Sequence, residues 1–94
     1  MTHKLKILPH YFSAVLCGDK TFEIRDNRDR GFQRGDVVVL QEWEQPKAVY
    51  GGRYTGREIE KTISYVTNYE QKEGFVVFGI KDANDMVSLA CSKE

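Results

Sequence analysis

Alternating and continuous runs of apolar residues predict several short β-strands. Lys4–Ile7 and Thr21–Arg25 alternate polar and apolar residues, as a strand with two different faces does. The run VVVLQEW at 37–43 is the strongest strand prediction, and the following strand along the chain is expected at REIEKTISYV, 57–66. The continuous apolar run FVVFGI at 75–80 is typical of a buried strand. The chain is therefore expected to be rich in β-structure.

One helix is expected near the start of the chain. Pro9 suits the first turn of a helix, and the residue before it is biased toward an extended conformation. The stretch PHYFSAVLCG then places Phe12, Val15 and Leu16 on one face, with Gly18 available to end the helix. A helix this short needs a sheet to lie against.

Two long loops separate the strands. DNRDRGFQRGD at 26–36 is rich in Asp, Asn and Gly and ends in a Gly35-Asp36 turn, while QPKAVYGGRYTG at 45–56 contains a glycine pair. The tail at 85–94 is either a last strand or a fraying end. Five or six short strands and one helix predict a mixed α+β, mainly β fold. The expected architecture is a small β-barrel with a strongly curved sheet and the N-terminal helix against it.

Length and composition narrow the class of protein. The 94 residues form one expected domain, 1–94, and 40% of them are hydrophobic, which suits a globular protein. No apolar run is long enough to span a membrane and no signal-peptide pattern opens the chain, so we expect a cytoplasmic protein that does not bind membranes. The two cysteines are expected to be reduced thiols. The His and Cys spacing does not fit a metal site, and no cofactor is expected.

Charge is unevenly distributed although the net charge is zero. Residues 1–35 carry seven Lys or Arg against four Asp or Glu, a net of +3, whereas residues 70–94 carry three against five, a net of −2. A zero net charge argues against binding of polyanions by bulk charge alone. The excess of positive charge toward the N-terminal third favours an anionic partner there.

A charged stretch at 18–36 contains the first candidate site. Glu23 and Arg25 are two residues apart on a strand, so their side chains leave from the same face, and Lys20 comes from the corner just before them. The polar face of Thr21–Arg25 is therefore expected to line a cleft. The charged residues of the following loop, Arg30 among them, are better explained individually as solvated surface charges than as ligand contacts.

The second long loop supplies further candidates. Tyr54, Thr55 and Arg57 lie close to glycines, and aromatic residues interleaved with arginine can stack bases and hold phosphates. Packing of Tyr54 on the end of the barrel is an equally open alternative.

The segment Gly18–Arg25 resembles the GxKxxExR signature of the ASCH domains, which are relatives of the RNA-binding PUA domains. The stretch from KILPHYF to VVVLQEW, followed by YTGRE, is similar to a short-chain, DUF3850-like subgroup of unknown function. This resemblance implies a PUA-like β-barrel with a cleft between barrel and helix. It places Lys20, Glu23 and Arg25 at that cleft and implies RNA, or a nucleotide derived from it, as the ligand.

Three functions are compatible with these features. The first is an RNA-binding module in which Lys20, Arg25 and loop arginines contact phosphates and Trp43 or Tyr54 stacks a base. The second is a metal-free hydrolase of RNA or of a modified nucleoside, with Lys20 and Glu23 as candidate catalytic groups. Some ASCH proteins have a threonine nucleophile at the position of Glu23, so that arrangement does not carry over. The third is a protein-interaction module using exposed aromatic side chains such as Tyr69.

Overall fold

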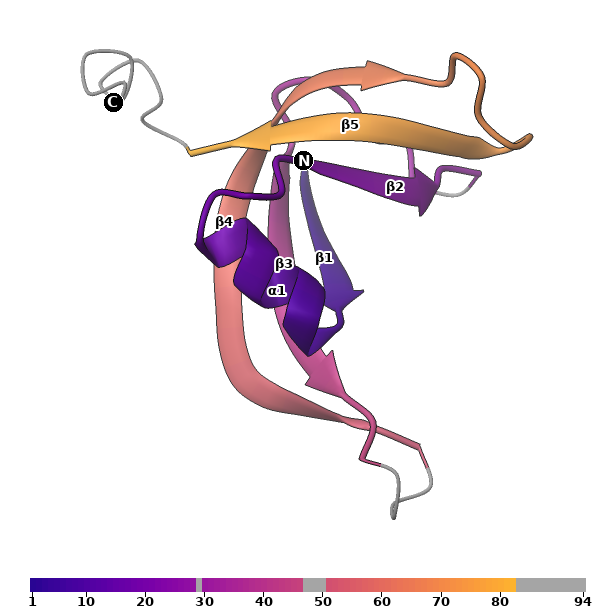
Figure 1. Ribbon diagram of the computed structural model, residues 1–94. Helices are drawn as coiled ribbons and strands as arrows, with labels where there is room; N and C mark the ends of the chain where they lie inside the picture. The colour runs from indigo at the N-terminus through magenta and orange to yellow at the C-terminus, as the bar shows by residue number, and fades with distance from the viewer. Residues whose placement is uncertain (29, 47–50, 83–94) are drawn as a thin grey trace.

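The chain forms a curled, five-stranded half-barrel with one short helix (Figure 1). The computed structural model describes residues 1–28, 30–46 and 51–82. Their elements are β1 (Thr2–Ile7), α1 (Pro9–Leu16), β2 (Phe22–Asp26), β3 (Val37–Glu44), β4 (Arg53–Thr67) and β5 (Phe75–Lys81). The mainly β fold with one helix is confirmed. The predicted tail at 85–94 lies outside the described residues.

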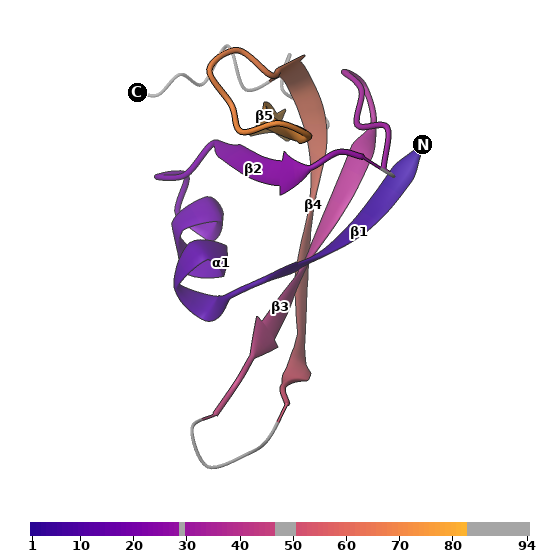
Figure 2. The same ribbon diagram turned by 90° about the vertical axis from the view of Figure 1, so that its right-hand side faces the viewer.

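The sheet has the strand order β1-β3-β4-β5-β2. β1 pairs with β3 in parallel, and the other neighbours are antiparallel. The 15-residue strand β4 bends, so that its first part pairs with β3 and its last part with β5. As a result β2 and β5 cross over the end of the other strands, and α1 covers the enclosed side (Figures 1 and 2).

The core lies between α1 and the enclosed face of the sheet. Its largest fully buried side chains include Phe12 of α1, Leu40 of β3 and Phe78 of β5. Phe32, from the loop before β3, also packs in this cluster. Burial of such side chains is the main stabilising contribution.

The helix begins and ends as its sequence predicts. Leu8 precedes it in an extended conformation, Pro9 occupies its first turn, and Gly18 follows it with φ = 86°. Phe12 and Val15 are buried as expected, but Leu16 is 55% exposed, so its predicted burial is wrong. Leu16 is the last helical residue, and the chain turns away directly after it.

The predicted loop at 45–56 is shorter than expected. Arg53 and Tyr54 pair with Glu44 and Trp43, so β4 begins at Arg53 and includes the YTG segment. An ion pair from Arg53 Nε to Glu44 Oε2, 2.7 Å, extends the hairpin beyond the core. We call its outer part, residues 41–46 and 51–58, the β3–β4 arm; it extends below α1 in Figure 2.

The Gly35-Asp36 turn is confirmed, with Gly35 at φ = 93°. Asp36 accepts hydrogen bonds from the buried His3 ring, 2.8 Å, and from the main-chain N–H of Gln33, 3.1 Å. The bond from His3 holds the pKa of Asp36 below its ordinary value. His3 is therefore a core histidine that fastens β1 to the start of β3. Among the described residues, no helix is long and apolar enough to cross a membrane.

Candidate functional site

A cleft of about 480 Å³ lies between the end of β1, the start of α1 and the edge strand β2. One wall is formed by residues 6–8 and Tyr11, and the other by Lys20 and residues 22–25. The three residues of the predicted GxKxxExR site, Lys20, Glu23 and Arg25, therefore line one cavity.

Glu23 is the centre of this group and is only 4% exposed. Its Oε2 accepts a hydrogen bond from Lys20 Nζ, and its Oε1 accepts one of 2.9 Å from Arg25 Nε. Lys20 Nζ also donates to the main-chain carbonyl of Phe22, 2.6 Å. The carboxylate thus fixes the positions of two cations at the cleft surface.

Strand pairing explains why a charged residue of β2 is buried. Glu23 is directly opposite Phe78, and Arg25 is opposite Val76, both of which belong to the core. Directly paired residues share a face of the sheet, so the polar side of β2 faces the interior. Its apolar side is the outer one: Phe22 is 45% and Ile24 53% exposed. The predicted alternation is present, with the apolar side turned to solvent.

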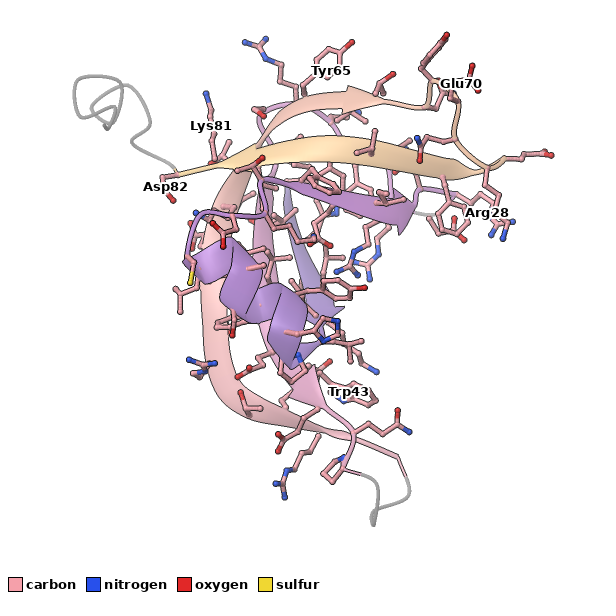
Figure 3. The ribbon with its side chains drawn as sticks, in the orientation of Figure 1. Arg28, Trp43, Tyr65, Glu70, Lys81 and Asp82 are labelled. Carbon is pink, nitrogen blue, oxygen red and sulfur yellow. The ribbon has the colours of Figure 1, made fainter. Side chains whose placement is uncertain are left out.

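Two arginines connect this region to the free edge of β1. Arg25 Nη2 donates to the carbonyl of Lys6, 2.8 Å, and Arg30 Nη1 donates to that of Lys4, 3.4 Å. The sequence-predicted Arg30 therefore lies along β1 and is not among the residues that line the cleft. Asp26 and Arg28, in contrast, form an exposed pair at the far end of β2 (Figure 3), and hydrogen bonds from Arg28 lower the pKa of Asp26 to about 2.

Aromatic rings lie beside the cations of the cleft. Lys20 Nζ is 5.6 Å from the centre of the Tyr11 ring and 5.1 Å from that of Phe22. Tyr11 is 47% exposed, so its ring is available to a ligand. These distances are in the range of cation–π contacts. Sequence reasoning missed Tyr11 because its role depends on the helix packing beside β2.

Lys6 is a further cation that sequence reasoning missed. Its Nζ lies 4.6 Å from the centre of the Trp43 ring, at the base of the β3–β4 arm (Figure 3). Gly52 contacts the same ring so closely that a Cβ there would lie 2.1 Å from Trp43 Cζ2. Trp43 is therefore engaged by its own chain and supports Lys6. The alternating pattern of β1 marked Lys6 only as an outward-facing residue.

The other predicted ligand residues lie on the β3–β4 arm, and the cleft lining does not include them. Thr55 Oγ1 and Arg57 Nε donate to Glu42 Oε1 at 2.7 and 2.9 Å. Glu42 is 4% exposed, and the hydrogen bonds from Arg57 and then from Thr55 lower the pKa of its carboxyl group. In turn, the hydrogen bond to Glu42 raises the pKa of Arg57. Tyr54 is 53% exposed beside Trp43.

The Arg57 guanidinium also lies 4.8 Å from the centre of the Phe12 ring. Arg57 thus joins the arm to the helix and covers the end of the core. Glu42, its partner, was not among the residues singled out by the sequence, because nothing in VVVLQEWE distinguishes it from Glu44, which is only half-buried.

Comparison with known proteins identifies a family and a phage relative. A family described as "Domain of unknown function (DUF3850)" matches residues 2–80. The "Uncharacterized 12.9 kDa protein in GpA 3'region" of Escherichia phage P2 is 41% identical over 66 residues, which cover 70% of this chain and 54% of that protein. This chain therefore spans about half the length of the phage relative. Since the family match includes the helix and nearly the whole sheet, the chain belongs to the DUF3850 family.

Proposed function

We propose that this domain binds RNA, and that the cleft beside β2 holds one nucleotide unit. The observation that carries the proposal is the composition of the cleft. Lys6, Lys20 and Arg25 line it together with the single carboxylate of Glu23, which leaves a net charge of +2. Exposed apolar and aromatic side chains stand directly beside these cations. An anion that carries an aromatic group matches both features.

The roles follow from the contacts. Lys20 and Arg25 are both held by Glu23, so they present their remaining N–H groups in a fixed arrangement to a phosphate. Tyr11 and Phe22 offer ring faces to a base, and base–aromatic stacking contributes ~1–3 kcal/mol per base. Glu23 acts as the positioning group and keeps the two cations from repelling one another.

The likeness of Gly18–Arg25 to the ASCH signature supports the same proposal. The curved sheet with a helix beside it is compatible with the PUA-like architecture that this likeness implies. One fold can host many unrelated functions, so the proposal depends on the charges and rings of the cleft.

The contacts favour binding over hydrolysis. A general base must reach the proton that it abstracts, whereas the Glu23 carboxylate is only 4% exposed and both of its oxygens accept hydrogen bonds from neighbouring cations. Lys20 likewise donates to two acceptors within its own site. Proton transfer to Glu23 would remove the negative charge that holds Lys20 and Arg25 in place.

The test is a native gel of labelled structured and single-stranded RNAs, run beside a denaturing gel of the same samples. Lys20→Ala and Arg25→Ala are compared with Lys81→Ala, which removes an exposed cation at the end of β5, away from Arg28 in Figure 3. We expect a shift without cleavage, weakened by both cleft variants and unaffected by the control. Binding weakens as salt increases, and each lost phosphate contact should make the negative slope of log K against log salt shallower by ~0.7 for a single-stranded RNA.

An affinity that does not change with salt, or no shift with any RNA, would contradict the proposal. New fragments that disappear in Lys20→Ala would replace it with a ribonuclease activity. A pull-down of protein partners that is unaffected by nuclease treatment, but abolished when surface aromatic residues are replaced, would instead indicate a protein-interaction module.

A further inference from the structure

The main-chain groups of β2 face alternately toward β5 and away from it. The Thr21 carbonyl accepts from Ile80 N–H, 2.9 Å, and Asn27 N–H donates to the Gly74 carbonyl, 2.8 Å. In an antiparallel pair the N–H and C=O of one residue point to the same side. Odd-numbered residues of β2 therefore bond to β5, and the N–H and C=O of Ile24 point to the free edge of the sheet.

This free edge opens into the cleft. Residues 22–25 all line the cavity although their side chains alternate between the two faces, so the cavity lies across the strand edge. The Phe22 carbonyl, on the same edge, accepts a hydrogen bond from Lys20 Nζ. By this alternation the N–H and C=O of Ile24 make no ladder bond to β5, and β2 has no strand on its other side. They form an adjacent donor and acceptor directed into the cleft.

The number of open groups argues against a peptide strand as the occupant. A strand added to this edge would need several successive N–H and C=O groups on the edge it joins. The Phe22 carbonyl is already occupied, and across the cleft the carbonyls of Lys4 and Lys6 are occupied by Arg30 and Arg25. Asp26, the next residue whose main chain points to this edge, is not among the residues that line the cleft. Within the cleft, the single donor–acceptor pair of Ile24 suits a ligand with one short hydrogen-bonding edge.

An unpaired nucleobase has such an edge, because its Watson–Crick side presents a donor beside an acceptor. A base in the plane of the strand edge would have Phe22 and Ile24 on one side and Arg25 on the other, since these side chains leave opposite faces of β2. We infer that the cleft recognises one unpaired base through the main chain of Ile24. This inference rests on the proposed RNA binding and adds that the ligand is single-stranded RNA or a loop, not a duplex.

Two measurements test it with a short mixed-sequence RNA. The first compares the affinity of the native protein for this RNA alone and annealed to its complement, because annealing occupies every Watson–Crick edge. We expect the single strand to bind at least about tenfold more tightly. This comparison needs no protein variant, so a folding defect cannot affect it.

The second measurement compares Ile24→Pro with Ile24→Val. Proline removes the N–H of residue 24, which makes no bond to β5, and proline is tolerated at such edge positions. Valine keeps the N–H and the β-branched shape. We expect Ile24→Pro to bind the single strand about five- to tenfold more weakly than Ile24→Val, with both variants checked for native circular dichroism.

The outcomes separate this inference from the proposed function. If the native protein binds neither form of the RNA, the proposed function fails and the inference with it. If it binds duplex and single strand equally, or if a folded Ile24→Pro binds as well as Ile24→Val, RNA binding stands and the inference is overturned. Displacement of the RNA by an extended Val- and Thr-rich peptide would also overturn it, because the edge would then take a strand.

Discussion

Arg25 Nη2 donates a hydrogen bond of 2.8 Å to the main-chain carbonyl of Lys6 and so joins the two edge strands of the sheet. Within the described residues, no ladder of main-chain hydrogen bonds connects β1 to β2. The half-barrel is instead bridged by side chains, and Glu23 holds the Arg25 guanidinium in place. A residue of the candidate site therefore also shapes the fold.

Replacing Arg25 by lysine should destabilise the protein although the charge is kept. A lysine ammonium lacks the planar fork that reaches both Glu23 and the Lys6 carbonyl. We expect a loss of about 1.5–3 kcal/mol in the free energy of unfolding, measured with urea. The control is Arg53→Lys, whose pair with Glu44 is largely exposed and should contribute under ~1 kcal/mol. Equal stabilities of the two variants would show that Arg25 does not bridge the edges.

Gly52→Ala should displace the Trp43 ring. The added Cβ would lie 2.1 Å from Trp43 Cζ2, so the ring must move and its contact with Lys6 is disturbed. Because Trp43 is the only tryptophan, its fluorescence emission reports this directly. We expect an altered emission maximum and a loss of about 1–3 kcal/mol.

The matched control is Gly56→Ala. Gly56 has φ = 99°, so alanine there is strained, but the added Cβ would meet no atom within 4 Å. This variant should lose stability without a change in emission. An unchanged emission in Gly52→Ala would contradict the described packing.

Acid should destabilise the protein through Glu42 and Asp36. Their hydrogen bonds to Arg57 and His3 hold both pKa values below the ordinary 4.5 and 3.8. As the pH falls, these two carboxylates therefore take up protons in the unfolded chain before they do so in the folded protein. Their stabilisation is complete above the ordinary pKa values and is lost as the pH falls through the lowered pKa values of the folded state. We expect the urea midpoint to fall below about pH 4.5.

Glu42→Gln identifies the contribution of one carboxylate. This variant should be less stable than the native protein near neutral pH, because Arg57 loses its charged partner. Its stability should then decline less steeply on acidification, as measured by urea unfolding across the acidic range. A decline as steep as that of the native protein would show that Glu42 does not contribute.

Removing the aromatic rings of the cleft should weaken RNA binding without changing its salt dependence. Tyr11→Ala and Phe22→Ala delete stacking surfaces but no charge, so we expect losses of ~1–3 kcal/mol in binding free energy. The slope of log K against log salt should stay constant, in contrast to Lys20→Ala. Tyr69→Ala removes an aromatic side chain that is 75% exposed outside the cleft and should have no effect. A reduced slope in Phe22→Ala would mean that the ring only positions Lys20.

Local features of the fold could be predicted because they depend on neighbours in the chain. Alternation in Lys4–Ile7 predicted β1, and Pro9 with Gly18 predicted the limits of α1. Spacing of two residues on a strand predicted that Glu23 and Arg25 share a face, and the structure joins them by hydrogen bonds. The assembly of Lys20 with this pair was also expected, since the helix-to-strand corner is short.

The sequence by itself thus determined the strands, the helix and the charged cluster of β2. Only the tertiary structure decided which face of β2 is buried, because that depends on its pairing with Phe78 and Val76, far away in the chain. It likewise brought Lys6 and Tyr11 to the cleft and carried Arg57 to Glu42 on the arm. Local periodicity shows that a strand has two faces. Packing of distant elements selects the face that lines the cleft.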